Sequence, residues 1–127
     1  MREIIFRGKR TDNGEWVDGA VYKIPRSEGL ICIIFLDWSG WRKYAVDPET
    51  VGQYTGLKDK HGKMIFEGDI LRQKSNGVYG LPFSVVFDDG SFMWNENGRR
   101  DLLYQRICDA CEVIGNIHDR ITEENDG

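Results

Sequence analysis

The sequence lacks an apolar run long enough to span a membrane, and it has few residues of the kinds that build catalytic or metal sites. A membrane helix needs about 20 consecutive apolar residues, whereas the run at residues 30–36 has only seven. The chain has only two histidines, three cysteines and three prolines. We therefore expect no membrane partner and no cofactor.

The cysteines and the first residues indicate a reducing compartment. An odd number of cysteines does not suit a secreted protein held by disulfides, but it is ordinary in the cytoplasm. Residues 1–6 contain no long apolar segment of the kind that a signal peptide has. We therefore expect a cytoplasmic protein.

The charge of the chain argues against a general attraction to nucleic acid. The net charge is −4 at pH 7, so the phosphate backbone would be repelled on average. The distribution is uneven, however: residues 1–63 carry 11 Lys or Arg and 9 Asp or Glu, whereas residues 64–127 carry 6 and 12. A local basic face on the N-terminal half therefore stays open.

Short apolar segments between turn residues predict a mainly β protein with at most one or two short helices. Residues 30–36 are apolar on both faces, which predicts a buried central strand, and Gly19 indicates a bulge. Residues 102–110 fit either a short helix or a strand. The predicted strands are residues 3–7, 15–24, 30–36, 41–46, 53–57, 63–66, 70–73, 83–87, 91–95 and 111–117.

The segment at residues 51–70 carries the densest structural information. Residues 58–62 form a polar loop between two short strands, and the loop closes if Gly62 has a left-handed backbone conformation. Glu67-Gly68-Asp69 then turns the chain into the next strand. The order of turns and strands that follows is typical of a small SH3-like barrel, a fold that does not by itself give a function.

Asp47-Pro48 separates two predicted lobes, because proline has no backbone N–H to donate inside a sheet. We expect a small N-terminal lobe with a bent sheet at residues 1–50, and an SH3-like β-barrel lobe at residues 51–119. We expect residues 120–127 to be a frayed or disordered acidic tail. A single integrated domain is the alternative, since the chain has only 127 residues.

Five motifs, in order along the chain, resemble those of the YopX family of bacteriophages and prophages. They are Ile-Phe-Arg-Gly-Lys-Arg at 5–10, Gly-Glu-Trp-Val at 14–17 with Gly19, Thr-Val-Gly-Gln-Tyr-Thr-Gly-Leu-Lys-Asp-Lys at 50–60, Glu-Gly-Asp-Ile at 67–70 and Glu-Val-Ile-Gly-Asn-Ile at 112–117. The resemblance spans residues 2–118. It implies a mainly β phage protein in the bacterial cytoplasm, with no established activity and no known catalytic or ligand residues.

The sequence departs from the family pattern in two places. His61 lies where the family turn usually has Asn, between Lys60 and Gly62. The family also usually starts a C-terminal helix with a proline after the last strand, whereas residues 118–121 contain none. The departure at residues 118–121 puts a C-terminal helix in doubt.

The residues that could carry chemistry have simpler interpretations. Cys108 and Cys111 have the spacing of half a zinc site, but only Cys32 and the two histidines, His61 and His118, could complete it. We expect the cysteines to be core residues and the histidines to be exposed, with metal binding and redox chemistry as weaker alternatives. No motif for nucleophilic catalysis or triphosphate binding is present. We therefore predict a protein without enzymatic activity and without a metal.

Basic and aromatic residues of the N-terminal half form the best candidate site. Trp and Arg are enriched at protein–protein contacts, and aromatic rings beside cations also bind single-stranded nucleic acid. Core packing with solvated cations is the alternative without a function. The candidate residues are Arg7, Lys9, Arg10, Trp38, Trp41, Arg42, Lys43 and Tyr44.

The sequence therefore favours a phage accessory protein that binds a host or phage protein. A second copy of the chain is an alternative partner, and a nucleic-acid-binding module is the alternative function. We expect at least one of Trp38 and Trp41 to be exposed beside Arg42 and Lys43, because residues around a loop tend to point outward.

Overall fold

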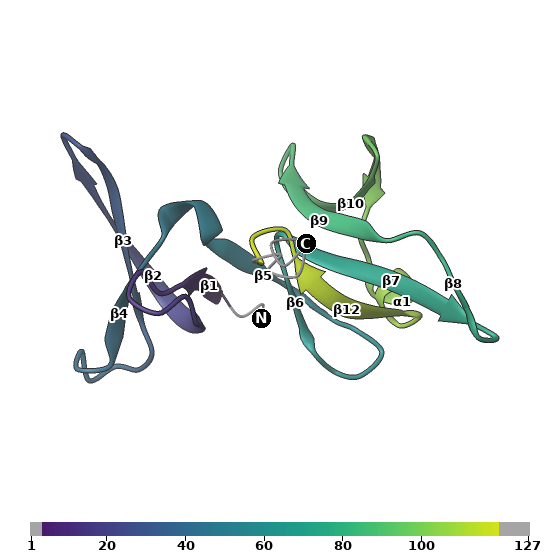
Figure 1. The fold of residues 1–127 in the computed structure, drawn as a ribbon, viewed down its shortest axis with the longest axis horizontal. Coiled ribbons are helices and arrows are strands. Elements are labelled where there is room, and N and C mark those ends of the chain that lie inside the picture. Colours follow the sequence, from purple (N-terminus) through teal and green to yellow (C-terminus); the bar gives the residue numbers. More distant parts are fainter. Residues whose placement is uncertain (1–3, 120–127) are drawn as a thin grey trace, which may run out of the picture. The chain divides into compact units, whose positions relative to one another are not determined.

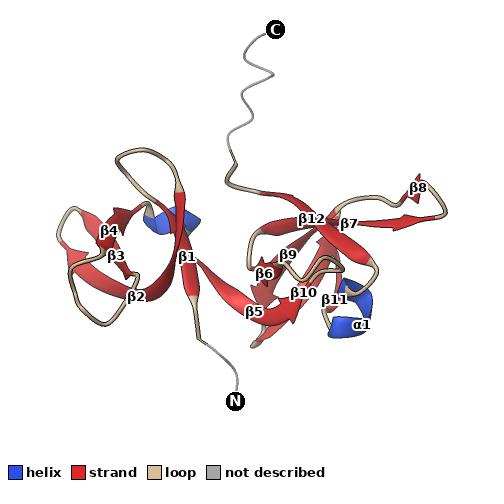
Figure 2. Ribbon diagram, turned by 90° about the horizontal axis from the view of Figure 1, so that it is seen from below, coloured by secondary structure: helices blue, strands red, loops and turns tan. Residues whose placement is uncertain are grey.

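The chain folds into strands joined by short turns, so the fold is mainly β, as predicted (Figure 1). The computed structural model describes residues 4–119. Figure 2 shows two short helical segments in blue, η1 (Pro48–Thr50) and α1 (Gln105–Cys108). The chain divides into two compact units, Met1–Gly56 and Leu57–Gly127.

The division into two separate lobes, at residues 1–50 and 51–119, stays a prediction. The predicted tail at residues 120–127 lies outside the described residues.

The first four strands of the first unit form an antiparallel sheet in which each strand pairs with its neighbours in the chain. They are β1 (Phe6–Lys9), β2 (Trp16–Arg26), β3 (Gly29–Phe35) and β4 (Lys43–Val46). An isolated bridge joins Arg10 to Val46, and the backbone N–H of Thr11 donates to the carbonyl of Ala45 over 3.0 Å. The sheet therefore bends until its fourth strand meets the residues that follow its first.

The core of the first unit lies on one face of this sheet. Cys32 and Ile34 of β3 and Val46 of β4 are buried together. The other face of β3 differs from the prediction, because Ile31 is exposed and Ile33 is only half-buried. β3 lies between β2 and β4 in the sheet, as expected of a central strand, but the expectation that it is buried on both faces is wrong. The described part of this unit has a single core cluster, and that cluster covers one face.

Gly19 lies where β2 passes the end of β3. Gly19 is the last residue of β2 that pairs with β1, opposite Phe6, and pairing with β3 starts at Ala20, opposite Phe35, so the bulge expected at Gly19 stays a prediction. A Cβ atom at this position would lie 2.1 Å from the carbonyl oxygen of Phe35. The strand has glycine here because the neighbouring backbone leaves no room for a side chain.

Asp47-Pro48 interrupts the strands as predicted, and the residues that follow form η1. The side chain of Asp47 caps this turn by accepting the backbone N–H of Glu49 over 3.0 Å. Thr50 is buried, and its hydroxyl accepts the backbone N–H of Lys9 over 2.9 Å. This bond ties η1 to β1.

The second unit holds a sheet with the strand order β11-β10-β9-β7-β12, and β8 pairs with β7. β5, which is paired with β1 at its start, ends in this unit, and β6 follows β5 in the sheet order. Closure into an SH3-like barrel stays a prediction. The strands are β5 (Gly52–Lys58), β6 (Met64–Phe66), β7 (Asp69–Ser75), β8 (Val78–Tyr79), β9 (Phe83–Asp88), β10 (Ser91–Glu96), β11 (Arg99–Leu102) and β12 (Cys111–Asn116).

The core of the second unit draws on most of its elements. Phe83 and Trp94 pack against it and meet edge to face, with ring centroids 6.3 Å apart. The buried apolar residues of this core are Ile65, Leu71, Val85, Phe92, Leu103, Cys108 and Cys111.

The loop between β5 and β6 is organised by the buried carboxylate of Asp59. One oxygen accepts the backbone N–H groups of His61 and Lys63 over 2.8 and 2.9 Å, and the other accepts that of Val113 over 2.9 Å. Burial opposes the ionisation of Asp59, but these three N–H donors outweigh it and lower its pKa. Gly62 has a φ of 81°, as predicted.

A second buried carboxylate, Asp69, fixes the turn between β6 and β7. It accepts the backbone N–H of Phe66 over 2.8 Å and the side-chain amide of Asn116 over 2.9 Å. Gly68 precedes it with a φ of 94°, and its carbonyl accepts the N–H of Ile117 over 2.9 Å. The Glu-Gly-Asp-Ile and Gly-Asn-Ile motifs therefore meet in one hydrogen-bonded structure.

The second unit contains two short strands that were not predicted, and one short helix in the segment that fitted either a helix or a strand. Asn76-Gly77 and Asn97-Gly98 have positive φ angles, and they form tight turns into the strands β8 and β11, which were not predicted. The ambiguous segment at residues 102–110 contains the helix α1. Gln105 at the start of α1 donates from its side-chain amide to the carbonyl of Lys58 in β5 over 2.7 Å.

Candidate binding surface

The loop between β3 and β4 is built by its own polar side chains. The carboxylate of Asp37 accepts the backbone N–H and the hydroxyl of Ser39 over 3.0 and 2.6 Å, and these bonds lower its pKa. The Ser39 hydroxyl in turn accepts the backbone N–H of Trp41 over 3.0 Å. Gly40 takes a φ of 82°, which lets the chain turn between the two tryptophans.

Both tryptophans of this loop point into solvent. Trp38 is 101% exposed and Trp41 is 86% exposed. The expectation that at least one of them is exposed is therefore confirmed. Arg42 lies 3.9 Å from the carboxylate of Asp37, and the Lys43 amine donates to the carbonyl of Gly40 over 2.9 Å.

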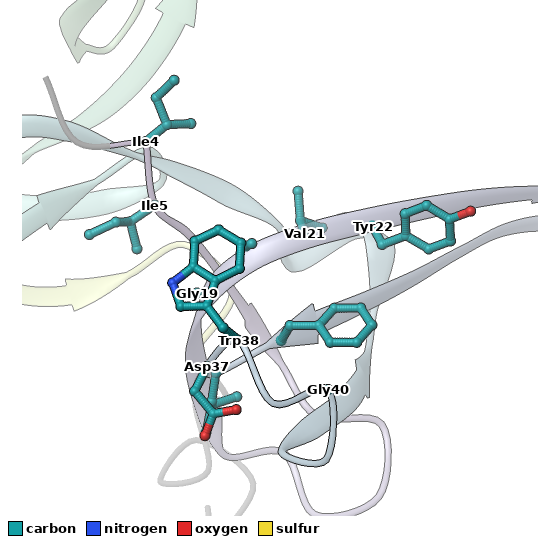
Figure 3. Close-up of a pocket in the computed structure, with 11 residues that line it drawn as sticks. Ile4, Ile5, Gly19, Val21, Tyr22, Asp37, Trp38 and Gly40 are labelled. Carbon is teal, nitrogen blue, oxygen red and sulfur yellow. The ribbon is translucent and has the colours of Figure 1, made fainter.

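An apolar groove of about 550 Å³ lies beside Trp38 (Figure 3). It opens to solvent, since Ile4 and Tyr22 in its wall are exposed. Figure 3 shows Ile4 and Ile5 on one segment of the groove, Val21 and Tyr22 on another, and Trp38 on the loop that carries Asp37 and Gly40. The groove is lined by Ile4, Ile5, Gly19, Ala20, Val21, Tyr22, Phe35, Leu36, Asp37, Trp38 and Gly40. We refer to this groove together with Trp38 and Trp41 as the tryptophan face.

The remaining candidate residues stack on aromatic rings of their own unit. The guanidinium of Arg7 lies 4.4 Å from the ring centre of Trp16, and the amine of Lys9 lies 5.4 Å from it. Arg10 lies 3.8 Å from the ring centre of Tyr44 and forms a 2.7 Å ion pair with Asp12. These cations and rings therefore form cation–π contacts with each other inside the first unit.

The predicted site residues therefore divide into two groups. Trp38, Trp41, Arg42 and Lys43 lie on or directly after the exposed loop. Arg7, Lys9, Arg10 and Tyr44 lie on or beside β1 and β4, and the cations among them cover rings there.

The sequence interpretation missed the groove. Its signal was the second apolar face of residues 30–36, which was interpreted as buried. Phe35 lies on that face, two residues from Ile33, and it lines the groove. A strand that is apolar on both faces needs a cover on both, and a binding surface is one way to obtain the second.

The cysteines lie in the two cores, as expected. Cys108 and Cys111 are buried and free in the second unit, and Cys32 is buried and free in the first. Burial raises the pKa of Cys108 to about 12 and also raises the pKa of the other two thiols. Among residues 4–119, no group of three or more His, Cys, Asp or Glu could hold a metal ion.

The histidines take different positions. His61 is exposed, and its Nε2 lies 3.5 Å from the carboxylate of Glu112, which also lies 3.4 Å from Arg72. His118 is half-buried, so the expectation that it is exposed is wrong. Its backbone N–H donates to the side chain of Asn116 over 2.9 Å, and this bond holds the residue against the end of β12.

No helix in the described part of the chain has the length and apolarity needed to cross a membrane.

The comparisons with known proteins agree with the fold and the motifs. The chain is similar to protein EF1440 from Enterococcus faecalis, whose crystal structure is known, with 25% identity and a TM-score of 0.57. The match covers 93% of this chain and 95% of that one. No curated protein matches. The family model described as YopX protein matches residues 5–121, and the chain belongs to the YopX family.

Proposed function

We propose that this chain is a non-enzymatic binding protein of a bacteriophage or prophage, and that it binds a host or phage protein in the bacterial cytoplasm. The observation that carries this proposal is the tryptophan face, where the exposed indole of Trp38 lines an open apolar groove and Trp41 is exposed three residues later in the same loop. Exposed apolar patches rimmed by polar residues are typical of interaction sites. Tryptophan and arginine are also the residues that most often anchor such contacts.

The arrangement of the loop supports a binding role. Asp37, Ser39 and Gly40 hold the backbone in a defined turn, so Trp38 and Trp41 project from a fixed frame. A fixed frame reduces the entropy that ordering the loop would cost on binding. Neither tryptophan is buried in the core of its own chain. Contact with a partner therefore explains the two tryptophans of this loop better than core packing does.

The chemistry of the described residues supports a protein without catalysis. The two buried carboxylates accept backbone N–H groups that organise turns, and the thiols of both cores have raised pKa values. Among the described residues that line the groove, Asp37 is the only carboxylic acid, and its carboxylate accepts the hydroxyl of Ser39. An enzyme would need several converging titratable groups in its pocket.

A nucleic-acid-binding module is the second candidate, favoured by the closeness of Trp38, Trp41, Arg42 and Lys43. Bases stack on exposed rings, and cations neutralise phosphates. Against this candidate, Arg42 lies beside Asp37, and Arg10 is paired with Asp12. We expect at most weak binding to single-stranded DNA or RNA that disappears near physiological salt, because such binding releases counterions. Tight binding at that salt, lost in a Trp41→Ala, Arg42→Ala variant, would favour the second candidate instead.

Site-directed crosslinking tests the proposed function. A photo-reactive phenylalanine analogue replaces Tyr22, which is exposed in the groove wall. The crosslinked product is recovered from bacterial cells that carry the phage or prophage and is identified by mass spectrometry. We expect a protein adduct that the same analogue at Tyr104, an exposed residue of the second unit, does not give.

Calorimetry with the purified partner then gives the energetic test. We expect the Trp38→Ala, Trp41→Ala double variant to bind at least about 30-fold more weakly, the size of a hot-spot loss of ~2 kcal/mol. Tyr104→Ala should bind as the wild type does. Unchanged affinity of the double variant would show that the partner uses another surface.

A further inference from the structure

We propose that a second copy of this chain occupies the tryptophan face, with Trp38 of each copy inserted into the groove of the other. This inference rests on the proposed function, because it names a partner for the same surface. It makes the contact reciprocal, as the two-fold symmetry of most protein dimers requires.

The anchor and its receptor lie on the same unit. A two-fold interface is formed by one patch that complements itself, so the patch must carry both a projecting group and a hollow. Trp38 projects fully into solvent, and the groove beside it has a volume of about 550 Å³. Its walls include the apolar side chains of Ile4 and Phe35. The groove therefore offers both the volume and the apolar walls to bind the Trp38 indole of a second copy.

The area of the patch fits a stable dimer. An aromatic side chain buries roughly 150–250 Å² on leaving water. Trp38, Trp41 and Tyr22 are all exposed on the first unit. Together they offer roughly 450–750 Å² per copy, before the groove walls are added, and a standard interface buries about 800 Å² per partner.

The charges near the patch also allow self-association. Residues 1–56 carry equal numbers of basic and acidic side chains, so two first units do not repel each other strongly. Asp37 and Arg42 lie on either side of Trp38 and Trp41 and are only 3.9 Å apart in one copy. A patch with one acid and one base can pair reciprocally, whereas a patch of a single sign cannot.

The mass of the full chain in solution tests the inference. Sedimentation equilibrium across micromolar concentrations should show a monomer–dimer equilibrium for the wild type. Trp38→Ala removes two anchors from the symmetric dimer, so it should weaken dimerisation by roughly 1000-fold, about 30-fold for each anchor. Tyr104→Ala is the matched control on the second unit and should leave the equilibrium unchanged. A monomeric wild type, or a dimer that Trp38→Ala leaves intact, would overturn the inference.

A mixing experiment tests the reciprocal insertion itself. Ile4→Glu places a charge in the groove wall at an exposed position, so we expect the fold to tolerate it. Each of Trp38→Ala and Ile4→Glu should be monomeric alone, because each removes both contacts of the dimer. Mixed in equal amounts, they should form heterodimers, since the Trp38 of the Ile4→Glu chain meets a groove on the other chain that keeps Ile4 and lacks only its own Trp38 side chain. A mixture that stays monomeric would overturn the reciprocal arrangement.

The outcomes separate this inference from the proposed function. A monomeric wild type that still crosslinks to a host or phage protein through Tyr22 overturns the second copy as partner and leaves the proposed function standing. A monomer that gives no protein adduct contradicts both. A monomer that binds single-stranded nucleic acid through Trp38 and Trp41 assigns the tryptophan face to the second candidate function.

Discussion

At the scale of single residues, the buried carboxylates stabilise turns of the fold by accepting N–H donors. Asp59 and Asp69 are buried, and each accepts N–H donors from segments distant in the chain. Both lie in motifs that carry the family resemblance. These motifs therefore describe how the second unit holds its turns, and the exposed Trp38 and Trp41 lie outside them.

Asp59→Asn is expected to lower the free energy of unfolding by about 2 kcal/mol or more at neutral pH, because an amide group would face N–H donors that now meet a carboxylate. The lowered pKa of Asp59 adds a pH dependence. Its contribution is complete above the ordinary pKa of an aspartate, about 4, and is lost as the pH falls through the lower folded value. Urea melts should therefore show the two proteins converging in acid. A constant difference down to pH 2 would contradict this assignment.

Gly19→Ala is expected to lower the free energy of unfolding by roughly 2 kcal/mol or more, because the new methyl group would collide with the carbonyl oxygen of Phe35. Gly80→Ala is the matched control. A Cβ at Gly80 would make only ordinary contacts, 3.7 Å or more from its neighbours, so a change within about 0.5 kcal/mol is expected. Equal melts for the two variants would show that β2 and β3 separate easily at Gly19.

At the scale of elements, the sequence was informative wherever alternating apolar residues met glycine turns. Most predicted strands were found within a few residues of their predicted limits, such as β9 and β10 around Asp89-Gly90. β8 and β11 were missed because Val78–Tyr79 is very short and β11 is exposed at every residue, so neither shows a pattern of burial. The helix α1 was ambiguous because four residues are too few to show a helical period.

The candidate site could be predicted only in part, for a related reason. Loop position was enough to expect an exposed tryptophan beside Arg42. The groove depends on which residues of β2 and β3 lie beside Ile4 and Ile5, and that is a matter of sheet bending between distant segments. No local sequence pattern indicates this arrangement.

The turns on either side of β6 give a prediction at this scale. Gly62→Val and Gly68→Val should each lower the free energy of unfolding by ~1–3 kcal/mol, because valine resists the positive φ angles of 81° and 94° found there. Lys60→Val, in the same loop, is the control and should change little. Denaturant melts with losses under a few tenths of a kcal/mol at both glycines would refute the turn geometry.

At the scale of the whole molecule, two cores of unequal size predict unfolding in two steps. The described core of the first unit is the smaller cluster, so less apolar burial stabilises it. Of two variants that keep only Trp16 or only Trp94, the first should lose its folded fluorescence at a lower urea concentration. Trp16 lies on β2 and Trp94 on β10, so each reports on one unit. Superimposed curves would instead indicate one cooperative domain.

The distribution of the cysteines allows the unfolding of each unit to be detected by thiol alkylation. Cys32 lies in one core, whereas Cys108 and Cys111 lie in the other, and all three thiols are free and buried. An alkylating reagent reacts with a thiolate only when it becomes accessible. The mass of the intact chain would then rise by one adduct when the first unit opens and by two when the second opens. A single mass spectrum thus distinguishes the two events, without any engineered label.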